Sequence, residues 1–187
     1  KYYGQGILTL ANGEVKEGIW ENHKFKYAQK PSLNADYTAG NKAYKDGDYE
    51  KARRKWKAAA EQGDASAQLN LGLMYTTGLG VAKDTKEGFR WFRKAAEQGN
   101  AIGQLALGHM YSNGNGVIQN SVEAANWIRK SAEQGNAMAQ NDLGIRYQLG
   151  KGVAKNYQEA VKWYRKAAEK GNPIAQSNLG LMYFNGH

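Results

Sequence analysis

The chain has 187 residues, of which 41% are hydrophobic and 11% aromatic, with a net charge of +9 and no cysteine. The lack of cysteine excludes disulfide bonds, thiol catalysis and zinc sites built on thiolates. No run of apolar residues approaches the roughly 18 that a membrane-spanning helix needs, and aromatic residues recur too regularly for extended disorder. Residues 1–62 carry a net charge of +4 and residues 63–187 one of +5, so the excess forms no basic tail. We expect it to serve solubility, although an anionic partner would also suit it.

Residues 1–27 combine glycines with β-prone runs. We expect strands at about residues 6–11 and 14–20, joined by a type I′ turn at Asn12-Gly13, where both residues tolerate positive φ. Since an isolated hairpin is only marginally stable, it must pack on something, and we expect it to cap the helices that follow. The segment resembles one unit of the membrane occupation and recognition nexus (MORN) repeat, with Lys16 and His23 departing from that family's tyrosine and glycine. The matching residues are Gly4, Gly6, Gly13, Gly18, Trp20 and Asn22.

Residues 28–36 are predicted to be a linker, because Pro31 disfavours helix in the residue before it. From residue 37 onward, one motif returns at a fixed interval of 36 residues. An interval of this length indicates an array of helical repeats. In residues 37–63 the unit is shorter, since Gly40 and Gly72 are 32 residues apart. The four copies of the motif are Ala60-Glu61-Gln62-Gly63, Ala96-Glu97-Gln98-Gly99, Ala132-Glu133-Gln134-Gly135 and Ala168-Glu169-Lys170-Gly171.

The first half of each unit is predicted to be an amphipathic helix. A spacing of i, i+4, i+5, i+8 places Ala67, Leu71, Gly72 and Tyr75, and their counterparts, on one buried face. A glycine inside a helix costs about 1 kcal/mol relative to alanine, so we expect a close approach of the second helix to offset this cost. The N-caps are Asp64, Asn100, Asn136 and Asn172, the last followed by Pro173; the small residues of the second helix are Ala52, Gly88, Ala124 and Ala160.

A loop of the type Gly78-Leu79-Gly80-Val81 connects the two helices, and its valine is expected to fill the gap between them. The second helix is predicted to start with a capping box, in which the carboxylate three residues after the cap bonds back to the cap's own N–H. Tryptophan recurs inside this helix and a glycine ends it. The capping boxes are Asp84–Glu87, Asn120–Glu123 and Asn156–Glu159, and the tryptophans are Trp91, Trp127 and Trp163.

The combined pattern Ala-x-Ala-Gln-x-x-Leu-Gly-x-x-Tyr, Gly-x-Gly-Val, Ala-x-x-Trp, Lys-Ala-Ala-Glu-Gln-Gly resembles the Sel-one-like repeat, a relative of the tetratricopeptide repeat. The resemblance covers residues 64–187 closely and 37–63 loosely. It implies a mainly α protein, a right-handed α/α superhelix preceded by a short β-hairpin. It also implies a non-enzymatic scaffold that binds a protein or peptide, in a bacterial envelope or secreted protein rather than a cytoplasmic one. The predicted division is 1–27 hairpin, 28–36 linker and 37–187 repeat array, the last repeat being incomplete.

In tetratricopeptide geometry the first helices line a concave groove, and their positions that vary between units are the candidate contacts. Their mixture of apolar and amide side chains suits a peptide or helix with few charges. The alternative is that the rows containing Leu69 and Leu73 are half-buried packing. The candidate groove residues are Leu69, Leu73, Ile102, Leu105, His109, Met138, Asn141, Ile145 and Gln148.

The second helices carry a basic row on their outer face, typified by Arg90, Arg93 and Lys94. We expect an ordinary solvated face that glutamates partly neutralise, and no nucleic-acid binding, because no aromatic residue is interleaved. A different functional hypothesis is an envelope-associated module, in which the hairpin and this basic face contact acidic lipid or cell-wall glycan.

The histidines His23, His109 and His187 have no metal-ligand spacing and no nucleophile context, so we expect no catalytic residue, metal or cofactor. A buried polar cluster around His109 would reopen the question of an enzyme. The last first helix has no second helix to cover it, which predicts partial exposure of its apolar face. We expect either that the natural chain continues beyond His187 or that this end forms a homodimer with another copy. The residues expected to self-associate are Leu179, Met182, Tyr183 and Phe184.

Overall fold

The computed structural model describes the backbone of residues 3–9, 15–21, 24–27 and 33–187 and the side chains of residues 35–187. The strands β1 (Tyr3–Thr9), β2 (Val15–Glu21) and β3 (Lys24–Tyr27) pair antiparallel in the order β1-β2-β3. The predicted turn at Asn12-Gly13 lies outside the described residues, as do the side chains of residues 1–27. The type I′ turn, the MORN-like resemblance and the capping role therefore stay predictions.

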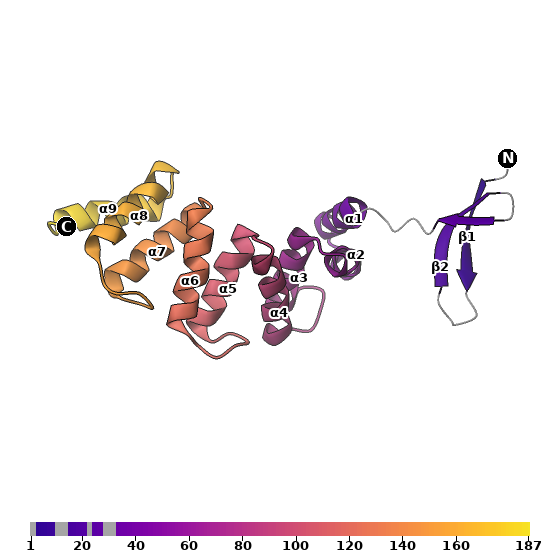
Figure 1. The fold of residues 1–187 in the computed structure, drawn as a ribbon, viewed down its shortest axis with the longest axis horizontal. Coiled ribbons are helices and arrows are strands. Elements are labelled where there is room, and N and C mark those ends of the chain that lie inside the picture. The colour runs from indigo at the N-terminus through magenta and orange to yellow at the C-terminus, as the bar shows by residue number, and fades with distance from the viewer. Residues whose placement is uncertain (1–2, 10–14, 22–23, 28–32) are drawn as a thin grey trace.

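The described chain after residue 32 is helical throughout, apart from short connections, and Figure 1 shows the helices stacked in pairs along an elongated array. Each helix packs mainly on the helices before and after it in sequence. The mainly α repeat architecture is confirmed. The helices are α1 (Leu33–Lys45), α2 (Tyr49–Glu61), α3 (Ala65–Thr77), α4 (Thr85–Glu97), α5 (Ala101–Asn113), α6 (Ser121–Glu133), α7 (Ala137–Leu149), α8 (Tyr157–Glu169) and α9 (Pro173–Phe184).

The predicted linker is too long at its C-terminal end. Helix α1 begins at Leu33, and Asp36 lies in its first turn. Asp36 is buried and accepts a hydrogen bond of 3.0 Å from Lys55 Nζ on α2. A carboxylate held in this way belongs to the first helical pair, so the repeat array begins before residue 37.

The helix caps are confirmed for the first helices and only in part for the second ones. Asp84 Oδ1 accepts from the N–H groups of Lys86 and Glu87, as a cap should. Its own N–H, however, donates to the carbonyl of Tyr75 at 2.8 Å. The prediction of a reciprocal bond from Glu87 to the cap N–H is therefore wrong. The returning loop places that N–H against the last turns of the preceding helix, where it is already hydrogen-bonded. Glu87 pairs instead with Arg90 at 3.0 Å.

The repeated helical glycine leaves a space that a large side chain of the second helix occupies, and we call this space the glycine socket. A Cβ added to Gly72 would lie 2.5 Å from the ring of Phe92, and one added to Gly144 would lie 2.6 Å from the ring of Tyr164. The predicted close approach is confirmed, because a Cβ added to Gly108 would also lie 3.1 Å from the carbonyl oxygen of Ala124. The sequence did not reveal the large side chain four residues after the small one, since its identity changes in every unit. The four occupants are Trp56, Phe92, Ile128 and Tyr164, opposite Gly40, Gly72, Gly108 and Gly144.

The long loops pack back on the preceding repeat. Gly152 has φ of +75° and lies against the Ser121 carbonyl at the start of α6, so neither a side chain nor another backbone conformation fits there. Gly80 and Gly116 lie in the same way against Tyr49 and Thr85. The valines that follow pack against the core, as Val81 and Val117 show. The loops thereby fix the register of successive helical pairs.

Candidate protein-binding groove

The exposed side chains of α3, α5, α7 and α9 form what we call the first-helix face. Ile102 and Met138 lie in the first turns of α5 and α7 and are 52% and 59% exposed. Leu73 is 47% exposed, and His109 is also solvent-accessible. Ile145 and Gln148 are half-buried. Six of the predicted groove residues therefore reach solvent on this one face.

The prediction that Leu69, Leu105 and Asn141 contact a partner is wrong. Leu69, Leu105 and Asn141 are only 9%, 5% and 5% exposed. Leu69 packs beside Phe92, and Leu105 beside Ile128. Asn141 accepts a hydrogen bond of 3.0 Å from Asn178 Nδ2. This row belongs to the core, which was the alternative considered for it; for Leu73 that alternative does not hold.

One of the residues predicted to self-associate is also buried. Met182 is 1% exposed and packs with Ala160 and Tyr164. Tyr183 and Phe184 are 51% and 88% exposed, and Leu179 is half-buried. Self-association through α9 stays a prediction that Met182 does not support.

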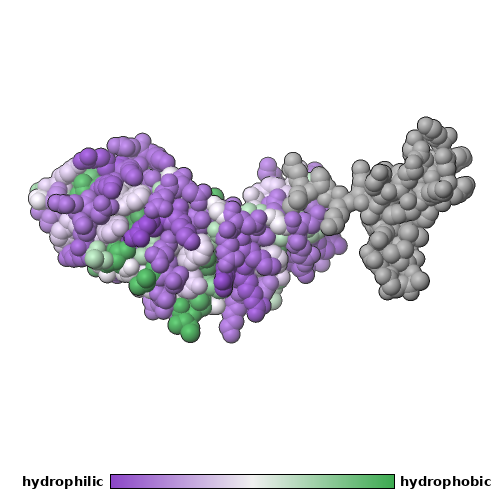
Figure 2. Space-filling view, in the orientation of Figure 1, coloured by the Kyte–Doolittle hydropathy of each residue, from purple (hydrophilic) through white to green (hydrophobic). Residues whose placement is uncertain are grey.

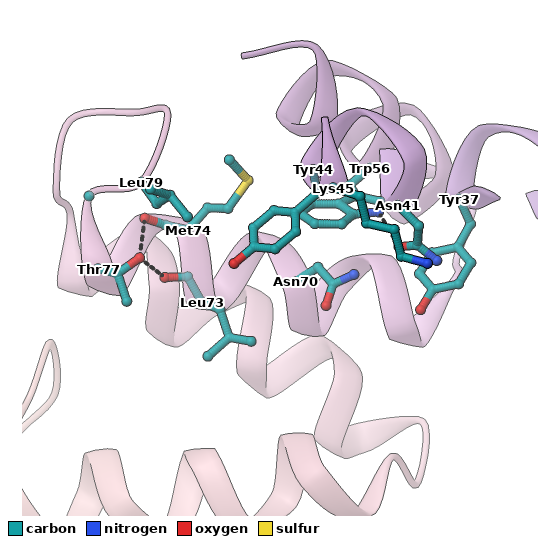
Figure 3. Close-up of a pocket in the computed structure, with 11 residues that line it drawn as sticks. Tyr37, Asn41, Tyr44, Lys45, Trp56, Asn70, Leu73, Met74, Thr77 and Leu79 are labelled. Atoms are coloured by element: carbon teal, nitrogen blue, oxygen red, sulfur yellow. Dashed lines mark hydrogen bonds between the residues drawn. The ribbon is translucent and has the colours of Figure 1, made fainter. Parts of the chain in front are cut away.

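A pocket of about 650 Å³ lies between α1, α2 and α3 at the N-terminal end of the array (Figure 3). The rings of Tyr44 and Trp56 are 5.4 Å apart in its wall, and Trp56 Nε1 donates to Asn41 Oδ1 at 3.0 Å. Leu73 belongs to the pocket and to the first-helix face at once. The lining residues are Tyr37, Asn41, Tyr44, Lys45, Trp56, Asn70, Leu73, Met74, Thr77, Gly78 and Leu79.

Sequence reasoning missed this pocket because the first unit is irregular. The candidate rows connect only positions that are 36 residues apart in sequence. Moving back by 32 residues instead brings Tyr37, Asn41 and Tyr44 into the rows of Leu69, Leu73 and Thr76. The shorter first loop, with its interval of 32 residues, therefore indicates which residues of α1 form the pocket wall.

A polar cluster does surround His109. Its Nε2 lies 2.6 Å from Asp142 Oδ2 on α7, and beyond it Arg146 Nη2 donates to Ser112 Oγ at 2.7 Å. Burial lowers the pKa of Arg146, and the Asp142 carboxylate opposes that shift. Among the described contacts, Ser112 is hydrogen-bonded to Arg146 and not to His109. The cluster therefore joins α5 to α7 and does not assemble a nucleophile with its base.

Tyr164 lies near this junction and is fully buried. Its hydroxyl donates to Gln148 Oε1 at 2.6 Å, and burial raises its pKa to about 12. Within the described residues, no group of three or more His, Asp or Glu side chains is placed to hold a metal ion. The described helices include none that is long and apolar enough to cross a bilayer.

The basic row on the second helices does have aromatic neighbours, contrary to the prediction. Lys94 Nζ lies 4.2 Å from the centroid of Trp91, and equivalent pairs join Lys130 to Trp127 and Lys166 to Trp163. Trp91 is only 6% exposed, so the lysine covers the ring and leaves little of it for a ligand. Other cations of the row also have internal partners: Arg93 with Glu97, Arg129 with Tyr147 and Arg165 with Tyr183.

Contact of this row with lipid or glycan stays a prediction. Figure 2 shows a mainly hydrophilic face with small, separate hydrophobic patches.

The helical pairs, their 36-residue period and the glycine sockets define a solenoid of the tetratricopeptide-like class. The chain belongs to the Sel1 repeat family, whose model matches residues 39–64, 65–100, 101–136, 137–172 and 173–187. Proteins built from this repeat generally act as scaffolds for protein–protein interaction.

Solved structures support the same assignment. A protective antigen of uropathogenic Escherichia coli with an SLR fold, c5321, is 38% identical over 86% of this chain, with a TM-score of 0.80. A Sel1 repeat protein from Oxalobacter formigenes is 40% identical over 83% of this chain, with a TM-score of 0.77. Helicobacter pylori cysteine rich protein B is 26% identical over 68% of this chain and 96% of its own length, with a TM-score of 0.55.

This chain spans 35% of the E. coli antigen and 65% of the Oxalobacter protein. No curated protein matches it. Bacterial relatives are compatible with an envelope or secreted location, which stays a prediction.

Proposed function

We propose that this repeat array is a scaffold that binds a protein or peptide partner in the groove formed by its first-helix face. The observation that carries the proposal is the row of exposed apolar side chains on successive first helices: Ile102, Met138 and Ile174, which are 52%, 59% and 61% exposed. They occupy the same position on α5, α7 and α9, so they form a line along this part of the array and not scattered spots; on α3 the position is Ser66. A continuous apolar row with a polar surround is the kind of surface on which a peptide or helix docks.

The proposed groove combines this row with Leu73 and His109 on one side. A partner would bury the apolar side chains and meet the imidazole of His109 near the middle, where Asp142 orients it. Because the buried row of Leu69, Leu105 and Asn141 lies beneath, the groove floor is held rigidly by the core. Preorganisation of this kind lowers the entropic cost of binding.

The test is capture of partners from bacterial lysate by immobilised protein, followed by mass spectrometry. Ile102→Asp with Met138→Asp should abolish capture of the specific partner, because two buried contacts would become charged and desolvated. The control is Arg90→Asp on the outer face, which places the same carboxylate at an exposed site; it should leave capture intact. Circular dichroism should show that both variants remain helical. A partner retained by the groove variant and lost by the outer-face variant would show that the proposed groove is wrong.

A further inference from the structure

The pocket between α1, α2 and α3 carries one cation and no carboxylate among its lining residues. The cation is Lys45, whose side chain is exposed and forms no ion pair in the described structure. Its neighbour on α1, Lys42, differs in this respect, because it pairs with Asp46 at 3.2 Å. Among the described residues that line the pocket, the ammonium of Lys45 is therefore the only charge that a ligand would meet directly.

Hydrogen-bond donors accompany that charge. Because Trp56 Nε1 donates to Asn41 Oδ1, the Asn41 amide is oriented with its Nδ2 free to donate. Asn41 and Lys45 are four residues apart on α1, so they are neighbours on one helix face, and Figure 3 shows the lysine extending along the pocket toward Asn41. Asn70 adds a second amide from α3. No described residue accepts from the Asn41 Nδ2 or from the Lys45 ammonium.

The remaining wall is aromatic and aliphatic. Tyr44, Trp56, Leu73, Met74 and Leu79 surround the space, and Trp56 and Met74 are themselves 4% and 2% exposed, so they are fixed by the core. The volume of about 650 Å³ is within the range of pockets that enclose a compact ligand. A bulky apolar side chain would fill the space inside this wall, and a carboxylate beside it would accept hydrogen bonds from Lys45 and Asn41.

We propose that this pocket binds an internal segment of the partner that carries a bulky apolar side chain next to an Asp or Glu. The apolar side chain fills the space between Tyr44 and Leu73, and the carboxylate accepts from Lys45 and Asn41. The inference rests on the proposed function, because Leu73 joins the pocket to the groove and a chain lying in the groove would enter the pocket. A bound chain that continues into the groove has its acid on a side chain, not at its terminus.

The test uses random seven-residue peptides displayed at the N-terminus of a phage coat protein, which present no free carboxyl end. Selection against the full chain should enrich Trp, Phe or Leu within two residues of Asp or Glu. Enriched peptides are then synthesised with amidated ends, and their Kd values are measured by fluorescence anisotropy. Raising the salt concentration should weaken binding, because the acid pairs with an exposed ammonium.

Three variants locate the contact. Lys45→Glu should raise the Kd about tenfold, and Lys45→Arg should change it less than about threefold. Lys86→Glu, which makes the same charge reversal at an exposed position on α4, should bind as the unaltered chain does. The inference is overturned if selection enriches no sequence or basic sequences, or if Lys45→Glu and Lys86→Glu have equal effects. It is also overturned if a free carboxyl end on the same peptides tightens binding tenfold, since the acid would then be terminal.

The two proposals fail in distinguishable ways. Peptides that depend on Ile102 and Met138 but ignore Lys45 would leave the groove in place and remove the pocket specificity. Peptides that depend on Lys45 but ignore Ile102 and Met138 would support the pocket and contradict the groove.

Discussion

At the scale of single residues, the glutamine of the repeated Ala-Glu-Gln-Gly motif is an inter-repeat contact. Gln98 Nε2 donates to Gln68 Oε1, and Gln134 Nε2 donates to Gln104 Oε1, each at 2.7 Å. In the fourth copy of the motif this position is Lys170, whose Nζ donates to the Gly135 carbonyl. The acceptor that a glutamine here would have served, Gln140 Oε1, is buried and has no hydrogen-bond partner among the described residues.

Replacing this lysine should therefore stabilise the array. Lys170→Gln restores a donor to Gln140 Oε1, and satisfying a buried acceptor is worth about 1 kcal/mol in the free energy of unfolding. The measurement is urea denaturation followed by circular dichroism. The matched control is Gln134→Lys, which should cost a similar amount by leaving Gln104 Oε1 unpaired. A Lys170→Gln variant that unfolds at lower urea concentration would contradict the role assigned to this ladder.

At the scale of helices, packing decides which glycine is required. A glycine in the middle of a helix is unfavourable by about 1 kcal/mol relative to alanine, so alanine should help wherever there is room for its methyl group. At Gly144 there is none, since the added Cβ would lie 2.6 Å from the fully buried ring of Tyr164. At Gly180, in the equivalent position of α9, no described atom outside the local backbone of α9 lies within 4 Å of an added Cβ.

The same substitution should consequently have opposite effects at these two positions. Gly180→Ala should raise the free energy of unfolding by up to about 1 kcal/mol through helix propensity. Gly144→Ala should lower it by about 1–3 kcal/mol, because Tyr164 must be displaced. Urea denaturation of both variants alongside the unaltered chain measures the difference. Equal effects at the two positions would show that the socket does not explain the glycine.

At the scale of the molecule, the sequence predicted what is periodic and missed what is not. The 36-residue period sufficed for the helices, the first-helix caps and the buried glycine face. The depth of a row such as Leu69 and Leu105 depends on the tilt between neighbouring repeats, which no single helix pattern contains. The pocket is formed by the two helices of the irregular first unit together with α3 of the next unit. The capping-box error at Asp84 depends on the path of a loop. Each of these needs contacts between segments, not spacing along one.

The junction between α5 and α7 departs from the apolar pattern of the preceding repeat. His109, Asp142 and Arg146 occupy the positions that Leu73, Ala106 and Met110 hold one repeat earlier. Arg146 is only 7% exposed, and its guanidinium donates to Ser112 Oγ and to two carbonyls. Replacing a buried ionic network by well-packed apolar residues is often neutral or stabilising, whereas removing one partner strands a charge.

The preceding repeat supplies the apolar template for a test of this junction. The triple variant His109→Leu, Asp142→Ala and Arg146→Met should be at least as stable as the unaltered chain. Asp142→Ala alone should lose about 1 kcal/mol, because His109 would lose its partner and Arg146 would keep its charge without the opposing carboxylate. Urea denaturation measures both. If the triple variant were the less stable of the two, the polar cluster would be needed to hold the third and fourth repeats together. If instead the triple variant is stable yet loses the partner captured through Ile102 and Met138, then the ionic junction serves recognition at a cost in stability.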